Sequence, residues 1–108
     1  MGTKTDKVIK AFTKVVHENI PSSKIILFGS RARGTFKKTS DYDFLLVSPE
    51  FRKWEWEERS ARVYYLKREI PASMDIFCLT PQEFKEKKKQ IGIVQQAVEE
   101  GIEITAQA

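Results

Sequence analysis

Three short apolar runs alternate with longer segments of helical character, and this alternation constrains the chain to an α/β fold. The runs cover residues 24–28, 41–47 and 73–79. They are rich in Ile, Leu, Val or Phe and are bounded by Gly, Ser or Pro, as is typical of buried strands. Around them, residues 4–19 place apolar side chains at helical spacing, and residues 52–69 contain neither Gly nor Pro. We therefore expect one compact unit built from strands and helices.

The last third of the chain carries its own start and stop signals. Thr80 is followed by Pro and, three residues after the cap, by Glu83, which predicts the start of a helix. A shorter helix is predicted over residues 94–100, with Gly101 as its C-terminal cap. Residues 102–104 alternate between apolar and acidic, which predicts a short edge strand.

The segment 52–69 is dense in Arg, Glu, Trp and Tyr. We expect it to form one long helix whose inward side chains are Trp54, Ala61, Tyr65 and Leu66. Trp54 and Trp56 cannot both face the core, because residues two apart do not share a helix face. An exposed Trp would suit contact with a partner protein, although singly exposed aromatic side chains are also common.

Composition narrows the classes of protein. With 108 residues we expect a single domain over residues 1–108 with one modest core. The chain lacks a signal-peptide pattern and an apolar stretch of the roughly 20 residues that span a bilayer, and its lone Cys78 cannot form an internal disulfide. These features favour a cytoplasmic protein. The net charge of +4 favours polyanionic partners, but we interpret the basic run 85–89 as a solvated face, so direct RNA binding is not favoured.

Three acidic residues carry the expected chemistry. Asp41 and Asp43 are two residues apart on a predicted strand and therefore project to the same side. Asp75 lies among Met, Ile, Phe and Leu in a separate strand, where a carboxylate is costly unless partners compensate its charge. Carboxylate oxygens of this kind suit Mg²⁺ or Mn²⁺. Two such ions about 4 Å apart are the arrangement used in many phosphoryl-transfer sites.

The turn after the first predicted strand offers a place for phosphate groups. Gly29 permits a close approach of phosphate to the backbone, and Ser30 adds a hydroxyl donor. Arg31 and Arg33 follow directly and are candidates for charge-assisted contacts to a triphosphate. Together with the acids, this turn suggests attack on the α-phosphate of a nucleoside triphosphate, with pyrophosphate as the leaving group.

These residues resemble a known signature. Gly29-Ser30, ten intervening residues and Asp41-Tyr42-Asp43 resemble the motif of the DNA polymerase β-like nucleotidyltransferase superfamily. More narrowly, residues 29–34 with 40–43 are similar to the minimal nucleotidyltransferase (MNT) domains of bacteria and archaea. The resemblance covers nearly the whole chain and implies an α/β (α+β) fold, in which helices flank a small mixed or antiparallel sheet of three to four strands, as in the polymerase β palm.

The resemblance also implies roles for the site residues. Asp41 and Asp43 would bind two Mg²⁺ ions, with Mn²⁺ as a substitute, and Asp75 would complete the metal site or act as a base. Gly29 and Ser30 would hold the triphosphate of ATP.

A partner and an activity follow from the same resemblance. Many MNT proteins pair with a HEPN-domain RNase toxin as its antitoxin, and some transfer AMP from ATP to a toxin tyrosine. The chain would then be an Mg²⁺-dependent nucleotidyltransferase acting on a protein or RNA hydroxyl, within a hetero-complex or an oligomer. The alternative is a non-catalytic antitoxin that neutralises its partner by complex formation. Antibiotic-modifying and tRNA end-adding enzymes are disfavoured, because they are longer.

Overall fold

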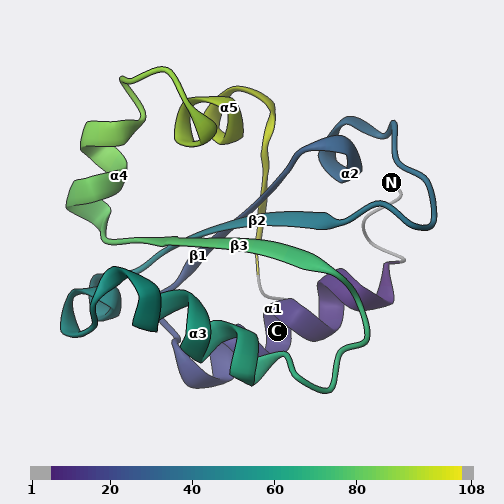
Figure 1. The fold of residues 1–108 in the computed structure, drawn as a ribbon, viewed down its shortest axis with the longest axis horizontal. Helices are drawn as coiled ribbons and strands as arrows, with labels where there is room; N and C mark the ends of the chain where they lie inside the picture. Colours follow the sequence, from purple (N-terminus) through teal and green to yellow (C-terminus); the bar gives the residue numbers. More distant parts are fainter. Residues whose placement is uncertain (1–5, 106–108) are drawn as a thin grey trace.

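The computed structural model of the protein describes residues 6–105, which form a four-stranded sheet between two layers of helices (Figure 1). The strand order is β3-β2-β1-β4. β1 (Lys24–Phe28) is antiparallel to both β2 (Tyr42–Val47) and β4 (Ile102–Ile104), whereas β3 (Met74–Leu79) is parallel to β2. The expected mixed sheet of an α/β fold is therefore confirmed, and each strand begins and ends within one residue of its predicted bounds.

Helices α1 (Lys7–Asn19) and α3 (Trp56–Leu66) cover one face of the sheet (Figure 1). Asp6 caps α1, because its carboxylate accepts hydrogen bonds from the first turn of the helix. The first residues of the predicted helix, 4 and 5, lie outside the described residues. On this face Phe12 of α1 stacks on Phe44 of β2 with 4.4 Å between ring centroids, and both are fully buried. Burial of one such ring contributes about 2 kcal/mol to folding.

Helices α4 (Pro81–Lys87) and α5 (Ile93–Glu100) lie over the opposite face (Figure 1). A second, smaller core lies beneath them, formed by Ile26, Phe28, Leu45, Val47, Leu79 and Ala97. The predicted capping box is confirmed: the Thr80 hydroxyl accepts the Glu83 N–H, and the Glu83 carboxylate accepts the Thr80 N–H. Gly101 ends α5 as predicted, in an extended conformation. Within residues 6–105, no helix combines the length and apolarity that a membrane span requires.

The prediction of one long helix over 52–69 was wrong. A 3₁₀-helix (Pro49–Lys53) comes first, the chain is extended at Trp54 and Glu55, and α3 begins only at Trp56. Ala61 is consequently exposed, and Tyr65 is 63% exposed. The inward positions on α3 are Arg59 and Val63, joined by the half-buried Leu66. An arginine on the buried face hid the helical period from the hydropathy pattern.

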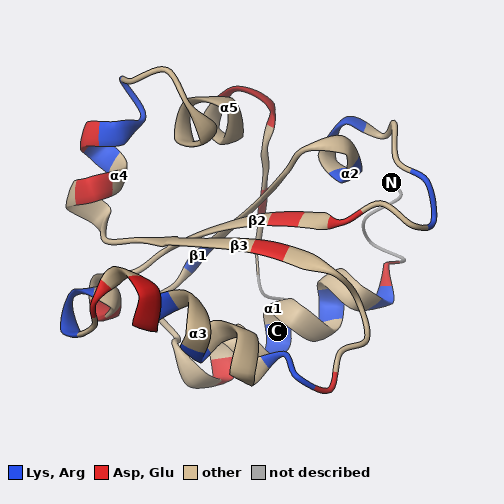
Figure 2. Ribbon diagram, in the orientation of Figure 1, with Lys and Arg blue, Asp and Glu red and all other residues tan. Residues whose placement is uncertain are grey.

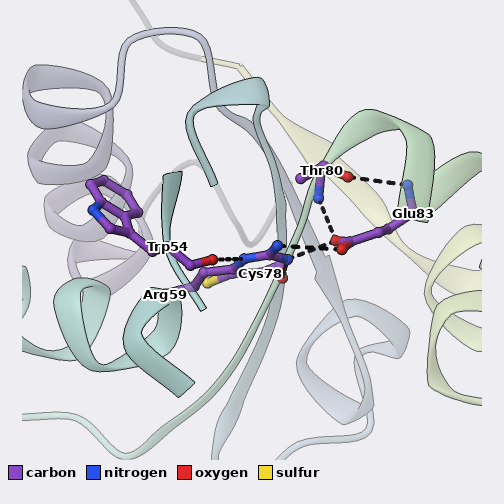
Figure 3. A network of polar contacts seen from close by, with 5 residues as sticks. All are labelled: Trp54, Arg59, Cys78, Thr80 and Glu83. Atoms are coloured by element: carbon purple, nitrogen blue, oxygen red, sulfur yellow. Dashed lines mark hydrogen bonds and ion pairs between the residues drawn. The ribbon is translucent and has the colours of Figure 1, made fainter. Parts of the chain in front are cut away.

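Arg59 holds three segments together (Figure 3). Its guanidinium donates to the backbone carbonyls of Trp54 (3.1 Å) and Cys78 (3.3 Å) and to the Glu83 carboxylate (2.7 Å). The hydrogen bond from Arg59 is the main reason why the pKa of Glu83 is lowered. Because Glu83 also caps α4 at Thr80, this network ties α3 to the end of β3 and to the start of α4.

Candidate active site

Asp43 and Asp75 lie opposite one another on adjacent strands. The parallel register pairs Asp43 of β2 with Asp75 of β3, and Phe28 of β1 lies on the other side of Asp43. Figure 2 shows the two acidic positions side by side at the same end of β2 and β3. Asp41 lies one residue before β2 and is exposed. Asp43 lies on the same sheet face as Leu45 and Val47, as alternation along the strand requires.

The electrostatics of Asp43 show how near these acids are to one another. The pKa of Asp43 is raised to about 6, first by burial and then by the neighbouring charge of Asp75, a hydrogen bond to Asp75 and the charge of Asp41. The guanidinium of Arg33 opposes this shift. The folded protein therefore holds mutually repelling carboxylates at one end of the sheet, an arrangement that a bound cation would relieve.

Asp75 is exposed although its neighbours in the sequence are apolar. Met74, Ile76 and Cys78 point to the other face of the sheet and are buried. Strand alternation explains the difference, because only every second residue of β3 faces the core beneath α1 and α3. Cys78 is buried in this core as a free cysteine.

The acidic side chains fit a divalent cation that takes its remaining ligands from the substrate. Among residues 6–105, no three His, Cys, Asp or Glu side chains are arranged around one point in a way that could hold a metal. The close group is the pair Asp43 and Asp75, with the charge of Asp41 nearby. Mg²⁺ usually binds through one or two carboxylates and takes its remaining ligands from water and substrate phosphates. The carboxylates of Asp43 and Asp75, on adjacent strands, meet that requirement.

The Gly29 turn lies against this pair. Gly29 links β1 to the short helix α2 (Ser30–Arg33) with φ 76°, a conformation that favours glycine. A Cβ atom at this position would overlap the carboxylate of Asp43. Both the backbone conformation and the space therefore require glycine here. Ser30, half-buried, begins α2 directly after the turn.

Arg31 holds the loop that leads to the acids. Its guanidinium donates to the backbone carbonyl of Ser40 at 3.0 Å and to carbonyls of the preceding loop at 3.2–3.3 Å. It also lies between the rings of Phe36 and Tyr42, at 4.6 and 4.0 Å from their centroids. These contacts position the segment that carries Asp41. A contact between Arg31 and phosphate remains a prediction.

Arg33 and the Gly29 amide share one carboxylate, which the sequence analysis did not identify. Glu100, the last residue of α5, accepts a hydrogen bond from the Gly29 N–H at 3.0 Å. Arg33 Nη1 donates to both carboxylate oxygens of Glu100, at 3.1 Å each. Gln96 donates to it at 2.8 Å. Hydrogen bonds from Gln96, Gly29 and Arg33 together lower the pKa of Glu100, although partial desolvation opposes them. Glu100 lies 67 residues from Arg33 in the sequence, so no local pattern marks this contact.

An apolar pocket of about 300 Å³ lies farther along the same sheet face. Its floor includes Leu45 and Phe77, the residues that follow Asp43 and Asp75 on this face by two positions. Trp56, 48% exposed, forms part of the wall together with the segment that connects α4 to α5. One end of this face is therefore charged and the adjoining surface is apolar.

The comparison with protein families assigns the chain. The profile of the family described as "Nucleotidyltransferase domain" matches residues 9–105. The chain belongs to this family. A search of curated proteins gave no match.

Solved structures agree on the fold of this nucleotidyltransferase domain. A crystal structure of a provisionally assigned nucleotidyltransferase from Sulfolobus solfataricus has a TM-score of 0.60 at 25% identity, covering 90% of this chain and 76% of that one. A second provisionally assigned nucleotidyltransferase has a TM-score of 0.54 at 21% identity, covering 75% and 87%. The structure of a toxin–antitoxin with AMP-PNP has a TM-score of 0.62 at 22% identity, covering 90% and 72%. The last two show the fold alone.

Proposed function

We propose that this domain transfers AMP from ATP, with Mg²⁺, to a hydroxyl group of a HEPN-type toxin and so acts as its antitoxin. The observation that carries the proposal is the pairing of Asp43 with Asp75 directly beside the Gly29 turn. The family assignment supports nucleotidyl transfer, and the similarity to a toxin–antitoxin structure supports the biological setting. The HEPN partner and AMP come from the resemblance of the motif to MNT domains.

Each element of the site has a task in this reaction. The Gly29 amide and Arg33 bind the outer phosphates of ATP, and Asp41, Asp43 and Asp75 hold the divalent ions. Bound Mg²⁺ supplies positive charge that lowers the repulsion between the triphosphate and the acids. The acceptor oxygen forms a bond to the α-phosphorus, and the bond from that phosphorus to the bridging oxygen of pyrophosphate breaks. The proton of the acceptor hydroxyl is released to water, because all three acids serve as ligands of the metal ions.

The proposal is tested with ATP labelled at the α-phosphate. The purified domain, Mg²⁺ and the co-expressed toxin are incubated together, and label on the toxin is measured. We expect label with the native chain and none with Asp43→Ala, because this change removes the acid that faces both Asp75 and the Gly29 turn. Glu86→Ala, an exposed position on α4, is the control and should leave labelling unchanged. Equal labelling by Asp43→Ala would contradict the proposal.

A non-catalytic antitoxin is the second candidate. The observation in its favour is that α3 carries three exposed aromatic side chains, Trp56, Tyr64 and Tyr65, which are 48%, 39% and 63% exposed. Such side chains are enriched at protein interfaces. If neutralisation depends only on complex formation, Asp43→Ala will protect cells from the toxin as well as the native chain does. Toxicity restored by that mutation would reject this candidate in favour of catalysis.

A further inference from the structure

Glu100 binds the same two groups that the proposed function assigns to the phosphates of ATP. The Gly29 N–H donates to Oε2 of Glu100 at 3.0 Å, and Arg33 donates to both of its carboxylate oxygens at 3.1 Å. A carboxylate held by a backbone amide and a guanidinium makes the contacts that a phosphate oxygen would make. The protein therefore fills this position with an anion of its own.

The contact is suited to exchange. The side chains of Arg33 and Glu100 are 46% and 23% exposed, and ion pairs of this exposure contribute little to stability. Glu100 is the last residue of α5, so its side chain can turn toward solvent while the backbone hydrogen bonds of the helix stay in place. A triphosphate brings more negative charge and more acceptor oxygens than one carboxylate. It would therefore replace Glu100, whereas a weaker anion would not.

We propose that Glu100 is a built-in competitor for the phosphate groups of the nucleotide, which must displace its carboxylate from the Gly29 amide and Arg33 in order to bind. This inference rests on the proposed function, because the competing ligand is the substrate of that reaction. The apparent dissociation constant for the nucleotide is then raised by the ratio of the closed to the open arrangement. Glu100 thus lowers occupancy of the site by weak anions at a cost in nucleotide affinity.

The test measures binding of Mg²⁺–ATP and of inorganic pyrophosphate by calorimetry. The full chain is compared with Glu100→Gln, which keeps the size and one acceptor oxygen, and with Glu100→Ala, which removes the contact. Glu99→Gln is the matched control, since Glu99 is the exposed neighbour on α5 and forms no hydrogen bond or ion pair among residues 6–105. We expect both Glu100 variants to bind about 3–10-fold more tightly, in line with loss of a competing arrangement. Glu99→Gln should stay within about twofold of the native chain, because rim charges act weakly.

The outcomes separate this inference from the proposed function. Unchanged or weaker binding by Glu100→Gln, with ATP still bound by the native chain, would overturn the inference, because Glu100 would then support the turn. Absence of ATP binding by the native chain and every variant would reject the proposed function and the inference with it. A two-dimensional amide spectrum of each variant establishes that it is folded. The Gly29 amide resonance should shift in Glu100→Ala before nucleotide is added. If Glu100→Ala fails to fold, Glu100→Gln decides the result.

Discussion

The two ends of the β2–β3 pair each carry an Arg–Glu pair, and the two pairs serve opposite purposes. Where β3 ends, the Arg59 side chain is 9% exposed, and Arg59 binds two backbone carbonyls as well as Glu83. At the acidic end, the Arg33 side chain is 46% exposed, and its partner Glu100 also binds the Gly29 turn. The same chemistry is thus fixed at one end and exchangeable at the other. Burial and the number of additional partners make the difference.

The energetics of the two ends differ in the same way. The end with Arg59 satisfies its polar groups, and Glu83 has a lowered pKa. The end with Asp43 holds carboxylates that repel one another, which destabilises the folded state. We expect substitutions at the first end to reduce stability and substitutions at the second end to change function first.

The largest effect on stability should come from Arg59→Met. This change leaves Glu83 and the carbonyls of Trp54 and Cys78 without their donor. We expect the free energy of unfolding in urea to fall by about 3 kcal/mol, the low end of the range for breaking a buried ion pair. The matching change at the other end, Arg33→Met, should leave the unfolding midpoint unchanged. Equal losses from the two substitutions would remove the distinction between a fixed pair and an exchangeable one.

Gly29→Ala should have a smaller effect on stability together with a complete loss of ATP binding. An alanine at this position would have to adopt an unfavourable positive φ, and its methyl group would overlap the Asp43 carboxylate. We expect a loss of about 2 kcal/mol in unfolding free energy. Gly34→Ala is the control, since Gly34 has φ 82° but open space around its Cβ position. It should cost about 1 kcal/mol and leave binding intact. Similar binding by the two alanine variants would show that contact with Asp43 is unimportant.

The smallest effect is a gain in stability from Asp43→Asn. The pKa of Asp43 rises from 3.8 to about 6 on folding, so the folded state binds its proton more tightly and loses stability as pH rises between these values. Asparagine removes this penalty. In metal-free buffer at pH 7.5 we expect a gain of about 1 kcal/mol, less than the shift alone implies because solvent screens the charges.

The pH dependence provides the check on that gain. Urea unfolding of Asp43→Asn and the native chain should give the same free energy below about pH 3, where Asp43 is protonated in both the folded and the unfolded native chain. A variant less stable than the native chain at pH 7.5 would show that Asp43 stabilises the fold, contrary to the contrast between the two ends.

Local patterns were sufficient to predict the four strands and the start of α4. The strands were predicted to within a residue because their apolar runs stop at Gly, Ser or Pro, and the capping box at Thr80 is a local motif. Side-chain alternation placed Asp75 and Cys78 on opposite faces of β3. It could not predict the exposure of Asp75, because buried residues such as Leu45 and Leu79 lie on the same face as Asp75.

Two features depended on tertiary contacts that no local pattern reveals. Arg59 faces inward only because Glu83, on another helix, supplies its partner. Glu100 reaches Gly29 across 71 residues of sequence, and only the packing of α5 over β1 brings them together. Charged residues in helices are usually solvated, so the sequence pattern favoured an exposed position for both.

The parallel register of β2 and β3 also fixes how far apart two of the acids lie. Neighbouring strands lie about 4.8 Å apart, close to the separation of about 4 Å between ions in two-metal sites. Backbone hydrogen bonds, rather than side-chain packing, therefore set the distance between Asp43 and Asp75. A slip of β3 by one residue would carry Asp75 to the opposite face and bring Met74 or Ile76 into its place. The spacing of the acids is thus protected by the same hydrogen bonds that make the sheet.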